Sequence, residues 1–326
     1  MKKTAVLFLL VALSVAFSLA FGSQPLAIKD LFTAKETVSK TIFFNIRLPR
    51  TILAALSGML LAGSGAVFQL FFRNSLAEPG IMGMTSGAAL GAVTAGCMST
   101  GIFAGFISSV NAGAFIGALI AGIIVIIISS NKKGPSSAVA VLLCGTALGT
   151  LYSSLTSIIL TFNSKKISYM YLWMLGSFSG RGWNEVYVIL LPSIISFVLM
   201  IALSFRLDLM GTGEITASSL GVQINILRAF VLVCGSFATS AAVCAGGTIG
   251  FIGLIVPHLI RRIFGVKSRL LIPLSLAGGV IMLLISDTLC RIIIAPGELP
   301  VGTVTALMGA PFFIFILFSS KGHKNG

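Results

Sequence analysis

The sequence predicts an all-α, polytopic membrane protein, and three observations support this. The 326-residue chain is 56% hydrophobic and only 9% charged, with a mean hydropathy of +1.07, whereas roughly a quarter of the residues of soluble domains are charged. Apolar runs of roughly 20 residues, enough for a helix to cross a bilayer core, recur along the whole chain. These runs are continuous rather than alternating, which favours helices over a β-barrel.

Ten apolar runs are the expected spans. In chain order they cover residues 4–22, 51–71, 81–99, 113–130, 137–161, 186–205, 228–246, 248–264, 270–290 and 301–318. No Pro- or Ser-rich linker and no block of charge divides them, so we expect residues 1–326 to form a single transmembrane domain. The longer connections 23–50, 162–185 and 206–227 are candidate contact surfaces, because loops often carry binding residues.

The first run has two possible interpretations. Lys2 and Lys3 precede it and small residues follow it up to Ser23, which also fits a cleaved secretory signal peptide. A retained first helix makes the number of spans even. Both basic termini then face the cytoplasm, as the positive-inside rule prefers. We therefore expect a retained first helix in a multi-pass cell-membrane protein with both termini in the cytoplasm.

Glycines at four-residue intervals predict close helix packing. They are Gly83, Gly87 and Gly91, then Gly113 and Gly117, and then Gly145 and Gly149. This pattern does not match a phosphate-binding loop.

The net charge of +14 comes from 22 basic and 8 acidic residues. Basic residues are scattered over the loops, so the charge is explained by membrane orientation rather than by nucleic acid. Most of them fall on the predicted cytoplasmic side. The outer side nevertheless keeps Lys29, Lys35, Lys40, Arg47, Arg50, Lys165, Lys166, Arg181 and Arg291. An acidic partner outside the membrane would account for this excess.

The chain has no Gly-Lys-Ser/Thr and therefore no P-loop for ATP. A partner must hydrolyse ATP, or an ion gradient must drive transport. A gradient-driven carrier, our alternative interpretation, needs ionisable groups inside the membrane. Only Asp287 lies well inside a span, and Arg291 follows at the i,i+4 spacing of a structural ion pair.

Covalent chemistry has no support in the sequence. The five cysteines are odd in number and form no C-x-x-C. No cluster of His, Cys or carboxylates fits a metal site or an enzyme. We expect no catalytic residue, metal or cofactor in this chain.

Several motifs occur in a recognisable order. They are Arg47-Leu-Pro-Arg50, the stretch Phe72–Gly80, Trp173–Ser177, Gly213 to Gly221, Gly250–His258, and Glu298-Leu-Pro to Phe312. In this order the chain resembles the FecCD-type permeases, the iron-siderophore, haem and cobalamin importers of the ATP-binding-cassette (ABC) class. The resemblance covers nearly the whole chain.

The resemblance implies a type II importer permease with ten membrane helices. The implied partners are an identical or related second permease, which forms a dimer with this one around a central path, two cytoplasmic ATP-binding subunits and an extracytoplasmic substrate-binding protein. Membrane lipid surrounds the permeases, and nucleic acid is not an expected partner. An iron-siderophore is the first expectation for the ligand, with haem and cobalamin-like compounds as alternatives.

The resemblance also assigns roles to individual residues. Glutamates of the binding protein would dock on Arg47, Arg50 and Arg291, because guanidinium groups hold carboxylates bidentately. A cytoplasmic gate would use Asn74 and Leu76, and the start of the fifth span would add Ser136 and Ser137. Contacts with the ATP-binding subunit would come from Gly211, Glu214, Ala217, Leu220 and Gly221. Ser75 and Thr248 stand where many relatives have proline.

Overall fold

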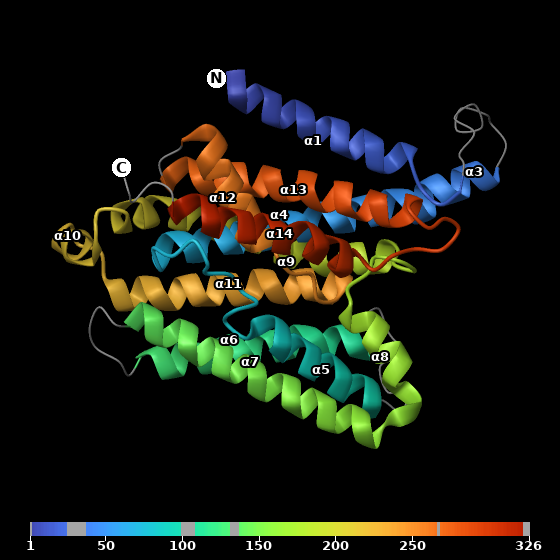
Figure 1. Ribbon diagram of the computed structural model, residues 1–326, viewed down its shortest axis with the longest axis horizontal. Helices are drawn as coiled ribbons and strands as arrows, with labels where there is room; N and C mark the ends of the chain where they lie inside the picture. The colour runs from blue at the N-terminus through green and yellow to red at the C-terminus, as the bar shows by residue number, and fades with distance from the viewer. Residues whose placement is uncertain (1, 25–36, 99–107, 131–136, 266–267, 322–326) are drawn as a thin grey trace.

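The computed structural model describes residues 2–24, 37–98, 108–130, 137–265 and 268–321. Within these ranges, ten helices of at least 13 residues match the ten predicted spans (Figure 1). They are α1 (Lys2–Ala20), α4 (Leu48–Phe71), α5 (Met84–Met98), α6 (Ser109–Ser130), α7 (Ser137–Phe162), α9 (Trp183–Met210), α11 (Ile224–Gly246), α12 (Ile252–Phe264), α13 (Ser268–Ile292) and α14 (Val301–Lys321).

Short helices lie in the connections. They are α3 (Val38–Thr41), η1 (Ile42–Arg47), η2 (Ser164–Lys166), α8 (Ile167–Met174) and α10 (Glu214–Ser219). Among the described residues, seven helical segments are long and apolar enough to cross a membrane, and α3, η1 and α4 form one of them. The other three are shorter in this sense: α5, α12, and α14 over Val301–Ile314. The non-helical connection before each of α5 and α12 runs among the packed helices, and Pro79 of the first lies against Gly253 of α12.

The helix α4 is the centre of the bundle and packs against α9, α11, α12 and α13. Glycine allows its backbone to approach theirs. A Cβ atom at Gly58 would lie 2.3 Å from the carbonyl oxygen of Gly279 in α13, and one at Gly65 would lie 2.0 Å from that of Gly253 in α12. Because glycine has no side chain, the helix backbones are in close van der Waals contact at these crossings, and a larger residue would not fit there.

The predicted glycine packing is confirmed at α5. Gly87 and Gly91 lie against Gly117 and Gly113 of α6, and a Cβ atom at Gly91 would lie 2.1 Å from the carbonyl oxygen of Gly113. Gly83, just before α5, lies against Gly145 of α7. The pattern therefore joins α5, α6 and α7 into one layer, which Figure 1 shows beside α11.

The bundle has two ends, named here after the short helices that lie there (Figure 1). At the α10 end, Lys3 Nζ donates to the carbonyl oxygen of Ile263, which joins the start of α1 to the end of α12 at 2.9 Å. At the α8 end lie the end of α1, the start of α4 and the end of α13. In the predicted topology, the α10 end would face the cytoplasm and the α8 end would face outward.

Candidate functional site

A buried ionic network occupies the α8 end of the bundle. Arg50 donates to both carboxylate oxygens of Asp287, from Nε at 3.0 and 3.2 Å and from Nη2 at 2.8 Å. Its Nη1 donates to Glu298 at 2.9 and 2.8 Å. Arg291 Nε lies 3.2 Å from Asp287, so the predicted ion pair is confirmed. Buried charges require such pairing because they have left water.

Two arginines also hold the end of α1. Arg47 donates to the carbonyl oxygens of Leu19 and Ala20 at 2.9 and 2.6 Å, and also to that of Gln24. Arg291 donates to the carbonyl oxygens of Ser18 and Phe21 at 3.2 and 3.1 Å. The last carbonyls of a helix lack partners within it, and cations are favourable there. The helix α1 thus packs onto the bundle at this end, and its retention stays a prediction.

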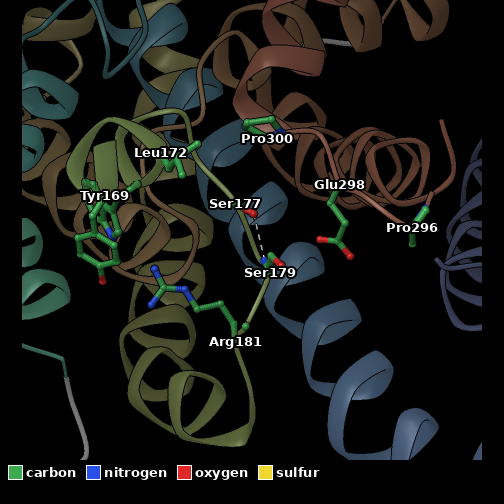
Figure 2. A pocket seen from close by; sticks show the side chains of 10 residues that line it. Tyr169, Leu172, Ser177, Ser179, Arg181, Pro296, Glu298 and Pro300 are labelled. Carbon is green, nitrogen blue, oxygen red and sulfur yellow. Dashed lines mark hydrogen bonds between the residues drawn. The ribbon is translucent and has the colours of Figure 1, made fainter. Parts of the chain in front are cut away.

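A pocket of about 680 Å³ opens beside this network (Figure 2). Tyr169, Leu172 and Trp173 of α8 form one wall, and the loops 177–181 and 296–300 form the others. Figure 2 shows Glu298 on one side and Arg181 on the other. Since Glu298 also holds Arg50, it connects the pocket to the buried network.

The loop 177–181 owes its shape to glycine and to a local hydrogen bond. Gly176 and Gly180 have φ of 75° and 69°, in the left-handed region that favours glycine. The backbone N–H of Ser179 donates to Ser177 Oγ at 3.1 Å (Figure 2). This turn places Arg181 at the pocket, where its guanidinium also lies 4.0 Å from Glu185.

One face of α7 carries exposed hydroxyl groups, which the sequence analysis missed. They belong to Thr146, Thr150, Ser153, Ser154, Ser157 and Thr161. Each donates to a backbone carbonyl three or four residues earlier, at 2.8 to 3.0 Å. The donors are satisfied in this way, while the acceptor lone pairs stay available. The spacing of three and four residues was the signal in the sequence.

At the α10 end, the segment 211–221 stands out from the bundle (Figure 1). Gly213 and Gly221 have φ of 114° and 87° on either side of α10. Ala217 is fully buried, whereas Ile215 is 86% and Leu220 59% exposed. A hollow of about 620 Å³ lies under Leu220 and Gly221, between the end of α9 and the start of α11. Apolar side chains this exposed beside a hollow are typical of a protein interface.

Comparison with known proteins identifies the architecture. The family model of the FecCD transport family matches residues 9–319. The chain belongs to the FecCD transport family. It is 38% identical over 286 residues to the cobalamin import system permease protein BtuC of Halobacterium salinarum, covering 88% of this chain and 75% of that one.

Other relatives differ in the ligand that they are named for. The hemin transport system permease protein HmuU of Yersinia pestis is 35% identical, with 98% of this chain and 93% of that one covered. The probable iron chelatin transport system permease protein of Helicobacter pylori is 34% identical, with 99% and 100% covered. A solved metal-chelate type ABC transporter in an inward-facing conformation superposes with a TM-score of 0.86 at 29% identity, covering 98% of this chain and 99% of that one. The chain is therefore a transmembrane permease subunit of an ABC importer.

The arginines predicted to dock the binding protein of this FecCD permease are not on its surface. Arg47 and Arg50 are 4% exposed and Arg291 is 2% exposed. The structure brings Arg50 and Arg291 together on Asp287 and turns Arg47 toward α1. The sequence showed arginines at span edges but not the acceptors that fold onto them. Docking through these residues stays a prediction.

The predicted gate loop of the permease, residues 72–83, lies at the α10 end. Asn74 Oδ1 accepts the backbone N–H of Leu76 at 2.9 Å, a local turn that Asn favours. Ser75 and Leu76 line a small hollow with His258 and Phe312. Ser137 is the first residue of α7, and Ser136 lies outside the described residues. The gate role also stays a prediction.

Glu78 is the acidic residue of this loop. The backbone N–H of Leu254, in the first turn of α12, donates to its carboxylate. Burial nevertheless raises the pKa of Glu78 to about 7, because the surrounding protein disfavours the charged form more than this one hydrogen bond favours it.

Proposed function

We propose that this permease moves an iron chelate, in the first place an iron-siderophore, from an extracytoplasmic binding protein into the cytoplasm. Haem and cobalamin-like ligands are the alternatives. The hydroxyl face of α7 is the observation that carries the proposal. It runs from Thr161, beside η2 and α8, toward the α10 end, so it leads away from the pocket. Hydroxyl groups with available acceptors suit a cargo with many polar atoms better than they suit lipid.

The proposal includes a second permease whose α7 faces this one across the path. A single chain leaves the hydroxyl face exposed, and two such faces would enclose a polar channel. Neutral hydroxyl groups bind a passing ligand weakly, which favours its release at the far side. The second copy is identical or closely related.

The α10 end is proposed to face the cytoplasm and to contact an ATP-binding subunit through Ile215 and Leu220. Gly211, Glu214, Ala217 and Gly221 shape this segment. Closure of the ATP-binding subunits would move α10 and, through α9 and α11, the bundle. Leu76 and Asn74, with Ser136 and Ser137, are proposed to close the path at this end.

The α8 end is proposed to receive the binding protein. A glutamate of that protein would reach Arg50 by exchanging with Glu298, the network member that lines the pocket. Arg47 and Arg291 would support this exchange by holding α1 and Asp287 in place. Exchange of one carboxylate for another keeps the buried guanidinium paired throughout.

A gradient-driven carrier is the rival function, and it would depend on Asp287. That carboxylate is fully buried and is held by two guanidinium groups. Protonation of Asp287 during a transport cycle would remove a charged partner from two buried guanidinium groups, Arg50 and Arg291, which is costly. The geometry therefore favours the ABC importer.

Purification from native membranes tests the proposal. We expect an ATP-binding subunit to co-purify, and its ATPase activity to rise with one binding protein loaded with an iron-siderophore. Replacing Ser154 and Ser157 by leucine should then lower uptake while leaving ATP-binding subunit assembly unchanged. Transport by the chain alone, driven by an ion gradient, would support the rival function instead.

A further inference from the structure

An apolar groove of about 330 Å³ runs along α12 between α1, α13 and α14, from Ile285 in α13 toward Ile263 near the α10 end. Among the residues that the structure describes, its walls contain no charged side chain and include Leu7, Leu259, Ile263, Ile285, Met308 and Phe312. Water has no hydrogen-bond partner in such a groove, so it is filled by hydrocarbon when the protein lies in a bilayer. The remaining question is which hydrocarbon this is.

One cation, Lys3, stands where the groove reaches Ile263, and Arg262 precedes that residue in the sequence. Lys3 Nζ lies 2.9 Å from the carbonyl oxygen of Ile263, and Ile263 itself lines the groove. Arg262 is the preceding residue, and both cationic side chains are exposed. The sequences of α1, α12 and α14 contain no Asp or Glu, and Asp287 of α13 lies at the opposite end. Near Ile263, therefore, one cation contacts the backbone, a second lies next to it in the sequence, and these helices supply no carboxylate.

We propose that the groove is a binding site for one acyl chain of an anionic phospholipid, with the phosphate group between Lys3 and Arg262. The proposal rests on the proposed function only for its orientation, which puts this end in the cytoplasmic leaflet, where anionic lipids attract basic segments. Each cation near an anionic surface contributes about fivefold in affinity. Two cations therefore give a preference of about 25-fold over a zwitterionic lipid.

The groove and the hollow under the loop 72–83 share wall residues. Ile255 and Phe312 line the groove, and the same two residues line the small hollow under Ser75 and Leu76. An acyl chain in the groove thus supports the wall on which the loop 72–83 rests. An empty or differently filled groove would let that wall relax, so the lipid is a structural partner of the gate loop.

Lipid retention tests the site directly. The purified permease, with any ATP-binding subunit that co-purifies, is placed in nanodiscs of phosphatidylcholine with or without phosphatidylglycerol, and retained lipid is measured by native mass spectrometry. We expect the wild type to retain phosphatidylglycerol in preference to phosphatidylcholine. The double variant Lys3→Gln, Arg262→Gln should lose most of the 25-fold preference yet still retain a lipid.

Two further variants complete the test. Lys165 is an exposed cation at the α8 end, so Lys165→Gln should retain phosphatidylglycerol as the wild type does. Ile285→Trp fills the groove and should lose the retained lipid of either kind. Unchanged preference in the double variant, retention in Ile285→Trp, or a bound membrane peptide in place of lipid would each overturn the proposal. Because retention is measured without transport, it stays separate from the test of the importer.

Discussion

The buried network predicts a large effect for Asp287→Asn. The Asp287 side chain is fully buried and accepts from Arg50 at 2.8 to 3.2 Å and from Arg291 at 3.2 Å. Asparagine keeps the shape but removes the charge, which leaves two buried guanidinium groups with Glu298 as their one carboxylate. Breaking a buried ion pair costs about 3–5 kcal/mol. We expect about 3 kcal/mol, because Glu298 still binds Arg50 Nη1.

The assay can use the chain's own thiols. Cys234, Cys244 and Cys290 are free and buried, so a thiol-reactive dye reports their exposure as the purified permease is heated. Asp287→Asn should expose them at a clearly lower temperature than the wild type. The matched control is Glu185→Gln, which removes a partly exposed carboxylate 4.0 Å from Arg181 and should cost less than about 1 kcal/mol. Equal melting of both variants would refute the reasoning.

Three more perturbations probe the gate loop, the helix packing and α10. Burial raises the pKa of Glu78 from 4.5 to about 7, so the folded state binds its proton more tightly and stability falls as pH rises between these values. At pH 8, Glu78→Gln should therefore have a free energy of unfolding up to about 3 kcal/mol above that of the wild type, and near pH 4.5 the two should be about equally stable. A stability difference that stays constant between these pH values would contradict the pKa shift. The new side chain of Gly91→Leu would overlap the backbone of Gly113, so this variant should melt several degrees below the wild type. The control Leu143→Ala changes an exposed side chain and should leave the melting temperature unchanged. Leu220→Asp should abolish co-purification of the ATP-binding subunit without changing membrane insertion, and normal co-purification would contradict the assigned contact.

The sequence by itself determined the class of protein and its helices. Hydropathy is a local property, so each apolar run identified its own helix, and all ten predicted spans match helices in the described ranges. The glycine intervals and the Asp287–Arg291 pair were also readable, because both depend on the fixed geometry of one helix. The order of the motifs was sufficient to indicate the FecCD family.

Only the tertiary structure decided the surroundings of those residues. Arg50 meets Asp287 and Glu298 across 237 and 248 residues of sequence, and no local pattern encodes which distant helix packs against α4. For the same reason, arginines expected on the surface are buried, and Glu298 joins the pocket to the network. The hydroxyl spacing on α7 was visible in the sequence, but its exposure depends on which face of α7 packs against α5. Side-chain partners follow from helix packing, and packing is a property of the whole bundle rather than of any single segment.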